Sequence, residues 1–209
     1  MAVSCSTPED VVNVALRRLG ARARVENMMD GSDQAKAALD LYGQTRDELM
    51  RQQDWGFAER TAYLSLLKTA PTVGGVPTYV LPTSWNPATN PPPPWIYEYA
   101  YPSDCLKVRT LKVVSGTLPN FDPQPNIYEI ANDSNYSPPR KVILTNTGDA
   151  MCVYTGRVTD PATWEADFTE AVAASIARRL AVFVKDLNAE RLEFNDEMLA
   201  FHRADMEQG

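Results

Sequence analysis

The stretch LMRQQDWGFAERTAYLSL, residues 49–66, changes its apolar period in the middle. Before Trp55 the apolar residues recur at helical spacing, which is typical of an amphipathic helix. After it, Leu64 and Leu66 alternate with polar or smaller neighbours, which is typical of a strand. The stretch therefore predicts that a helical region ends near Ala58 and that a β region begins there.

Two helices are expected on the N-terminal side of this stretch. In the first, Thr7 can cap, Pro8 occupies the first helical position, and Gly20 provides a stop. Its apolar positions are Val11, Val12, Ala15, Leu16 and Leu19. A longer helix follows a loop, with Ser32 as a plausible cap and an end near Gln53. Its apolar stripe is Ala35, Ala38, Leu39, Tyr42 and Leu49.

The residues that follow predict about six short strands separated by turns. Residues 71–94 are rich in Pro, Gly, Thr and Asn, so we expect a turn at Gly74-Gly75 and a polyproline II spacer over Pro91 to Pro94. The next strand has one aromatic face, formed by Trp95, Tyr97, Tyr99 and Tyr101. Further strands are expected over residues 106–114, 127–130, 141–145 and 151–158, and Thr147-Gly148-Asp149 would turn the last hairpin.

Helical spacing returns at Trp164, where Thr163 can cap a third helix. Its apolar face is Trp164, Phe168, Ala171, Val172, Ile176, Leu180 and Phe183. A break or kink is expected at Lys185-Asp186. The final helix would then carry Leu187, Phe194, Met198 and Phe201 on one face.

The order of helices, then strands, then helices predicts an α+β fold. The simplest architecture is a helical bundle from the N- and C-terminal helices, with a small antiparallel β domain inserted between helices two and three. The expected boundaries are residues 1–58 for the N-terminal helices, 59–160 for the β domain with its Pro/Gly-rich loop, and 161–209 for the C-terminal helices.

Large aromatic residues mark both boundaries of the β domain, and such residues dominate core energetics. We therefore expect four of them to meet where the bundle joins the β domain. They are Trp55, Phe57, Trp164 and Phe168.

The charge balance argues against tight binding of nucleic acid. The formal net charge is -7 and the pI is about 4.8, whereas tight binding needs clusters of Lys and Arg to neutralise phosphates. Such a surface is compatible with DNA that slides past it. No apolar run is long enough to span a membrane. The cysteines Cys5, Cys105 and Cys152 form no CxxC motif, so we expect reduced thiols.

The residues predict neither a catalytic site nor a cofactor or metal site. The single histidine, His202, has no triad partners by sequence, and no Gly-rich phosphate loop follows a strand. Acidic residues crowd the last helix, but a metal site there would need ligands from other elements. The aromatic strand could stack single-stranded bases, but it contains Glu98 and no basic residue. A hydrophobic core or a subunit interface is therefore favoured for that strand.

Four segments, in order, resemble the tail tubular protein A family, the head-to-tail adaptors of short-tailed bacteriophages. Trp55-Gly56-Phe57-Ala58 resembles the family's "W-x-F-A" junction, and residues 101–106, YPSDCL, are similar to its "Y-P-x-D-C-L" segment. Thr159-Asp160-Pro161 with Trp164 and Phe168 resembles its "V-T-D-P … W … F" entry to the third helix. The Ala-rich residues 171–181 are similar to its "A-L-A-A-x-L-A-x-x-L-A" helix.

The resemblance implies a structural subunit of a twelve-subunit ring in the virion, at the head-tail junction, assembled in the host cytoplasm. The partners would be the portal protein above and the tail nozzle protein below, with DNA passing through the lumen without specific binding. It implies no catalytic residues, no cofactor and no contact with a membrane. It also implies that the C-terminal part reaches the portal, and there the candidate contact residues are Phe194, Met198, Phe201, His202 and Met206. The long Pro/Gly-rich stretch over residues 71–94 departs from the family pattern.

Two other readings remain open. The first two helices could form the helix-turn-helix of a DNA-binding regulator, supported locally by Arg17, Arg18, Arg22 and Arg24. The loop between those helices is longer than the usual turn, and the overall charge opposes this reading. Alternatively, carboxylates that converge only in the fold could form the site of an enzyme.

Overall fold

The computed structural model describes residues 5–20, 24–29, 33–73, 75–77, 85–113, 126–184, 196, 198 and 199. The fold mixes helices and antiparallel sheet, as an α+β class requires. Contacts divide the chain into two compact units. One, here called the helical unit, comprises Met1–Glu59 and Thr155–Gly209, and the other, the β unit, comprises Arg60–Tyr154.

Helix α1, Pro8–Arg18, begins and ends at residues that favour those boundaries. The Asp10 amide donates to Thr7 Oγ1 at 3.2 Å and the Thr7 amide donates to Asp10 Oδ2 at 3.2 Å, which is a reciprocal capping box. The predicted cap and start of the helix are therefore confirmed. Gly20 follows the helix with φ +71, a left-handed conformation that suits glycine.

Helix α2, Asp33–Gln52, matches the expected second helix, although its proposed cap Ser32 lies outside the described residues. Its buried stripe runs through Ala35, Ala38, Tyr42, Thr45 and Leu49. Leu39 was predicted to belong to this stripe, but its side chain is 47% exposed. It stands one residue beyond Ala38, which turns it by about 100° around the helix and off the narrow buried stripe.

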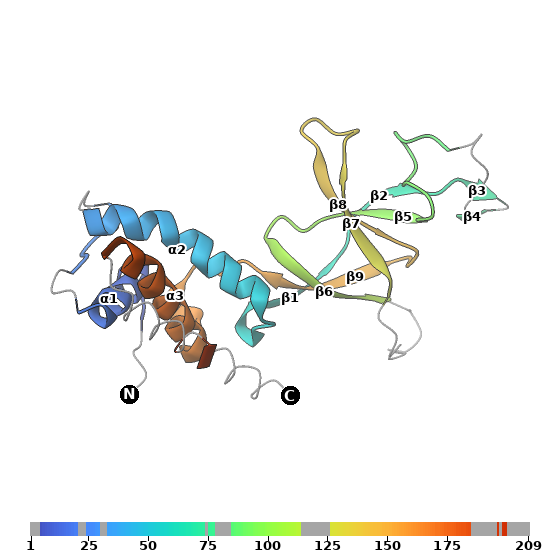
Figure 1. The fold of residues 1–209 in the computed structure, drawn as a ribbon. Coiled ribbons are helices and arrows are strands. Elements are labelled where there is room, and N and C mark those ends of the chain that lie inside the picture. The colour runs from blue at the N-terminus through green and yellow to red at the C-terminus, as the bar shows by residue number, and fades with distance from the viewer. Residues whose placement is uncertain are drawn as a thin grey trace. The chain divides into compact units, whose positions relative to one another are not determined.

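Helix α3, Ala166–Val184, is the centre of the helical unit, because α1 and α2 both pack on it (Figure 1). Phe168, Val172 and Ile176 are fully buried, as the apolar spacing predicts. The prediction that Thr163 caps this helix is wrong. A short 3-10 helix, Pro161–Thr163, precedes α3, and the Thr163 hydroxyl donates to the Asp160 carbonyl within it. Phe183, Lys185 and Asp186 lie among the residues whose side chains are not described.

The four boundary aromatics form one cluster in the helical unit, so their predicted contact is confirmed. The Phe168 ring lies 5.0 Å from Trp55, 5.0 Å from Phe57 and 4.9 Å from Trp164, measured between ring centroids. Tyr42 of α2 extends the cluster by stacking on Trp164 at 6.3 Å. The Trp55 indole also donates to the Leu49 carbonyl at 3.1 Å, which satisfies its polar group inside the core.

The β unit contains two main sheets. One has the strand order β1-β9-β6, formed by Glu59–Tyr63, Ala150–Gly156 and Cys105–Val113. The other is antiparallel with the order β2-β5-β8-β7, formed by Leu66–Thr69, Tyr97–Ala100, Arg140–Thr145 and Tyr128–Asp133. A small hairpin, β3 (Thr72–Val73) with β4 (Val76–Pro77), turns next to Gly75, which has φ +84. A turn is therefore confirmed at this glycine.

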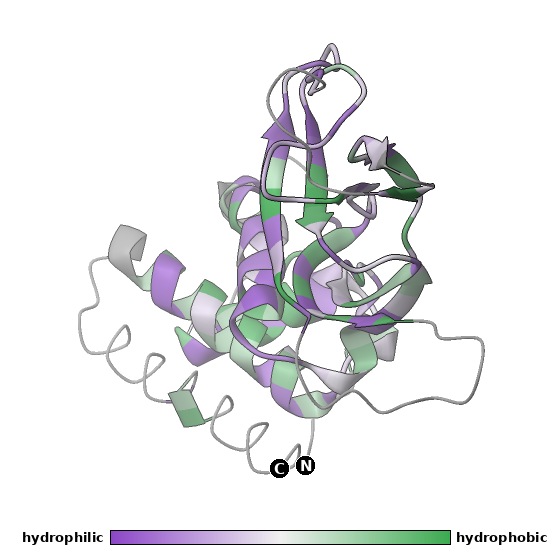
Figure 2. Cartoon of the chain, turned by 90° about the vertical axis from the view of Figure 1, so that its right-hand side faces the viewer, coloured by the Kyte–Doolittle hydropathy of each residue, from purple (hydrophilic) through white to green (hydrophobic). Residues whose placement is uncertain are grey.

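The core of the β unit lies between the two main sheets. It is built from Tyr99, Val108, Leu111, Ile143, Ala150, Cys152 and Tyr154, with Tyr97 and Tyr101 packed against it. Most of the aromatic strand therefore serves a hydrophobic core, as the sequence favoured. Trp95 is an exception, because it precedes β5 and its indole donates to Glu129 on the opposite face of the sheet. Figure 2 shows hydrophobic residues within the sheets and hydrophilic ones along the projecting β7–β8 hairpin.

Three local predictions in this unit are wrong. Leu64 and Leu66 do not share one strand, because the chain passes from β1 in one sheet to β2 in the other between them. Residues 147–149 do not turn a hairpin either. β8 already has β5 and β7 as neighbours on its two sides, so the chain crosses to the other sheet to form β9.

The third concerns Pro91 to Pro94, which do not form a continuous polyproline II spacer. The Trp95 amide donates to the Pro92 carbonyl at 3.1 Å, closing a turn over the last prolines. A polyproline II helix has no such internal hydrogen bond.

No helix in the described part of the chain is long and apolar enough to cross a membrane.

Candidate interaction surfaces and a buried polar network

The predicted portal-contact residues lie near the C-terminus, and Phe194, Phe201, His202 and Met206 fall outside the described residues. Met198 is described and its side chain is 53% exposed. Two residues before it, Asp196 Oδ2 accepts a hydrogen bond from Arg18 Nη1 at 2.9 Å. An exposed methionine on this segment is compatible with a contact surface, which stays a prediction.

Two of the four arginines that suggested a helix-turn-helix, Arg17 and Arg18, make contacts within the helical unit, whereas Arg22 lies outside the described residues. Arg18 pairs with Glu170 of α3 as well as with Asp196, and Arg17 Nε donates to the Asn13 carbonyl at 3.2 Å. α1 packs mainly on α3, and the α1–α2 connection runs from residue 19 to residue 32. Neither feature matches two helices joined by a turn of about three or four residues.

Asn13 of α1 holds part of that connection in place. Its side-chain amide donates to the Val25 carbonyl at 2.7 Å, and its carbonyl accepts from the Val25 amide at 2.8 Å. Beside this contact is a polar hollow of about 500 Å³, lined by residues that include Glu9 and Arg24. Sequence reasoning missed Asn13, although a polar residue inside an apolar helical stripe is the signal that would have found it.

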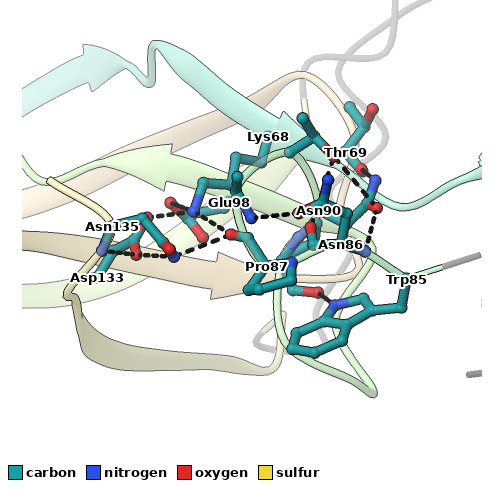
Figure 3. A network of polar contacts seen from close by, with 12 residues as sticks. Lys68, Thr69, Trp85, Asn86, Pro87, Asn90, Glu98, Asp133 and Asn135 are labelled. Atoms are coloured by element: carbon teal, nitrogen blue, oxygen red, sulfur yellow. Dashed lines mark hydrogen bonds and ion pairs between the residues drawn. The ribbon is translucent and has the colours of Figure 1, made fainter.

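The β unit buries a cluster of charged residues under the loop that precedes β5 (Figure 3). Lys68 of β2, Glu98 of β5 and Asp133 of β7 are 6%, 1% and 8% exposed. The Lys68 ammonium forms an ion pair with Asp133, donates to the Pro87 carbonyl at 3.0 Å and lies 3.6 Å from Glu98 Oε1. One cation thus serves two carboxyl groups and the backbone of the loop.

The two carboxyl groups have opposite protonation preferences. Burial, aided by a hydrogen bond with Asp133, raises the pKa of Glu98 to about 7. Burial alone would also raise the pKa of Asp133, but hydrogen bonds from Lys68 and Asn135 outweigh it and lower that pKa to about 2. Below about pH 7 the favoured state therefore pairs an aspartate anion with the lysine ammonium and keeps Glu98 protonated as a donor to the aspartate, so the buried charges balance.

Amide side chains extend this network into the loop. Asn135 Nδ2 donates to the Pro87 carbonyl at 2.9 Å, and Asn90 Nδ2 donates to the Thr69 carbonyl at 2.8 Å. The Trp85 indole donates to the Pro91 carbonyl at 2.8 Å. Pro87 and Asn90 of the Pro/Gly-rich stretch are therefore hydrogen-bonded to β2 and to the β7–β8 turn. The sequence placed Lys68 and Asp133 in no site, because their contact joins strands 65 residues apart.

A shallow hollow of about 430 Å³ opens elsewhere on the β unit, and we call it the tyrosine groove. It is lined by Tyr63, Leu64, Leu66, Tyr97, Tyr99, Gly148, Asp149 and Ala150. Tyr99 is 3% exposed and forms its floor, whereas Tyr63 and Leu66 are 72% and 52% exposed. Close packing of Tyr97 against Gly148 shapes one side, since a Cβ on Gly148 would lie 3.3 Å from the tyrosine hydroxyl.

No family model and no curated protein matches this chain. The resemblance to the adaptor family therefore rests on the four sequence segments.

Two acidic side chains and the cysteines are the groups among the described residues that could carry chemistry. Glu98 and Asp133 do converge, but they are buried together with Lys68 and line neither of the two hollows. Within the described residues no group of His, Cys, Asp and Glu has the arrangement of a metal site. Cys5 and Cys152 are free buried thiols, and burial raises the pKa of both.

Proposed function

We propose that this chain is a structural subunit of the head-to-tail adaptor ring of a short-tailed bacteriophage. In this proposal the two chain ends form a helical bundle, and the β domain is inserted between its second and third helices. The ring joins the portal protein to the tail nozzle protein and forms part of the DNA channel.

The observation that carries the proposal is the packing of two motifs that are far apart in sequence. Trp55 and Phe57 come from the "W-x-F-A" segment, and Trp164 and Phe168 come from the "V-T-D-P … W … F" segment. All four contribute to one aromatic cluster, with Trp55 and Phe168 fully buried. The Ala-rich fourth motif forms the buried face of α3, on which α1 and α2 pack. These three segments therefore supply core residues of the helical unit.

The remaining motif, residues 101–106, has a comparable role in the β unit. The Asp104 carboxylate forms an ion pair with Arg60 and accepts a hydrogen bond from the Tyr154 hydroxyl at 3.1 Å. Arg60 and Tyr154 are the first and last residues of that unit. Asp104 thus ties together the two strands by which the chain enters and leaves the β unit, which suits an inserted domain.

The charge of the chain suits a channel through which DNA moves. Each Lys or Arg contact with a phosphate would retard the DNA, and the net charge of -7 limits such contacts. We therefore expect the lumen of the ring to be neutral to acidic.

Co-sedimentation with purified portal rings tests the proposal. We expect the full chain to migrate with the portal, and failure to migrate with it would contradict the adaptor role. Deletion of residues 187–209 separates binding from folding. We expect the shortened chain to melt cooperatively, close to the full chain, but to lose portal binding.

A point variant sharpens the same experiment. Phe201→Ser changes a predicted portal contact, and Leu39→Ser is the matched control because Leu39 is a 47% exposed residue on α2. We expect the first variant to weaken co-sedimentation and the second to leave it unchanged. Equal binding of both variants to the portal would show that the portal contact does not involve Phe201 of the C-terminal segment.

A further inference from the structure

The tyrosine groove has the lining of a site that receives proline. Tyr63, Tyr97 and Tyr99 present aromatic surface, and Leu66 adds an exposed aliphatic side chain. Aromatic rings pack well against the pyrrolidine ring of proline, which is why aromatic residues line grooves that bind proline-containing segments. Asp149 is the one charged residue among the described lining, and its exposed carboxylate makes no ion pair with any residue the structure describes. A cation beside the proline would complete the site.

The β7–β8 hairpin of the same unit carries that chemistry at its tip. Residues 137–141 read Ser-Pro-Pro-Arg-Lys, and all five are exposed. The hairpin projects beyond the rest of the sheet in Figures 1 and 2. Arg140 lies over the Tyr136 ring at 4.5 Å and Lys141 over the Tyr101 ring at 4.0 Å, so both cations are held in place while remaining open to solvent.

The turn end of this hairpin is held by the buried network, because Asp133 is the last residue of β7 and pairs with Arg140. Asn135 is fastened to Asp133 and to the Pro87 carbonyl, and Asp133 is paired with Lys68. A tip that is already ordered loses little conformational freedom when it binds. The network therefore prepares the tip for a contact.

The tip and the groove lie at opposite ends of one strand. β8 begins at Arg140, directly after the prolines, and ends at Thr145, two residues before the turn that lines the groove. Six residues of strand span about 20 Å. Arg140 consequently cannot reach Asp149 of its own chain, and the two charges are free to meet between chains.

We propose that the proline-proline-cation tip at residues 137–141 docks into the tyrosine groove of a second copy of this chain. Pro138 and Pro139 pack on the exposed tyrosine and leucine of the groove, and Arg140 or Lys141 approaches the Asp149 carboxylate. Because donor and acceptor are different surfaces, the contact is head-to-tail and generates a ring when the rotation closes. The proposal rests on the proposed function for the ring, while the contact itself is carried by residues of the β unit alone.

Cysteine cross-linking in the full chain tests the contact. One preparation carries Ser137→Cys at the tip and another carries Tyr63→Cys in the groove, and the two are mixed under a mild oxidant. Both positions are exposed, so neither change disturbs the core. We expect a disulfide-linked dimer of the two chains. Leu66→Cys, also exposed in the groove, gives a second independent acceptor.

The matched control pairs Ser137→Cys with Ile127→Cys, whose side chain is 77% exposed but does not line the groove. The chain without added cysteines shows how much disulfide-linked dimer Cys5, Cys105 and Cys152 form by themselves. We expect Asp149→Asn in the acceptor chain to lower the yield about two- to five-fold, because it removes one exposed charge pair while asparagine tolerates the φ of 47 found there.

Equal yields from the groove and control positions would overturn the proposal, as would a yield unaffected by Asp149→Asn. Portal co-sedimentation of the same variants separates this idea from the adaptor role. Portal binding without groove cross-links would contradict the docking contact and leave the adaptor role in place. Groove cross-links without portal binding keep the docking contact and contradict the adaptor.

Discussion

Replacing Glu98 by glutamine is expected to change how the stability of the β unit depends on pH. Glutamine has the shape of the protonated side chain and can donate to Asp133 as the protonated carboxyl does, so the network keeps its geometry. Only the titration is removed. Glu98 suits this test because it is 1% exposed and its Oε1 has no hydrogen-bond partner among the described residues.

The direction and size follow from the raised pKa. The pKa of Glu98 is about 7 in the folded chain against an ordinary value of 4.5, so the protonated form favours folding. This contribution is fully present below 4.5 and is lost as the pH rises through about 7. The difference corresponds to about 3 kcal/mol, at about 1.4 kcal/mol for each tenfold change in proton affinity. Asp133, with its pKa lowered to about 2, acts oppositely, and its contribution is lost as the pH falls toward that value.

The assay is urea unfolding of both proteins at several pH values, with the difference in unfolding free energy plotted against pH. From about pH 5 to about pH 8 we expect the wild type to lose about 2–3 kcal/mol relative to Glu98→Gln. Glu129→Gln serves as the matched control, since its carboxylate is exposed on β7 of the same sheet. A difference that stays flat, or that favours the wild type as the pH rises, would refute the balanced-charge account of the network.

Three further substitutions test other parts of the account. Trp164→Ala should lower the unfolding free energy by about 3–5 kcal/mol in denaturant melts, because it removes a buried ring from the aromatic cluster, and a change near zero would contradict that role. Thr7→Ala should cost about 1 kcal/mol by opening the capping box of α1, visible as an earlier melt. Asp104→Ala should lower the unfolding free energy by about 1–2 kcal/mol, because it removes the contacts with Arg60 and the Tyr154 hydroxyl. An unchanged melt would show that these contacts do not stabilise the β unit. A mobility-shift experiment at low salt should show no tight DNA binding, whereas salt-sensitive binding would favour the regulator reading.

The sequence predicted helices well where capping residues, prolines and glycines mark the ends of a helix. The Thr7, Pro8 and Gly20 pattern located α1 because caps, proline and glycine act within a few residues of where they stand. The apolar spacing after Trp164 located the buried face of α3 for the same reason. Aromatics at the element boundaries also predicted a contact between segments more than 100 residues apart.

Other features depended on partners that the sequence does not reveal. The alternation at Leu64 and Leu66 could not show that the chain changes sheets there, since both strands have the same period. Residues 147–149 have the composition of a hairpin turn. The sequence does not show that β5 and β7 already pair with the two sides of β8, which leaves no side for β9. The buried network joins Lys68, Glu98 and Asp133 from three strands, and each charged residue alone resembles an ordinary surface position.

Imaging of the chain mixed with purified portal rings tests the adaptor proposal most directly. In negative stain we expect an added ring-shaped layer on one face of the portal, with a continuous channel and, as the resemblance implies, twelve subunits. Portal rings that remain bare at saturating concentrations of the chain, or that carry scattered single copies without a closed layer, would contradict the account.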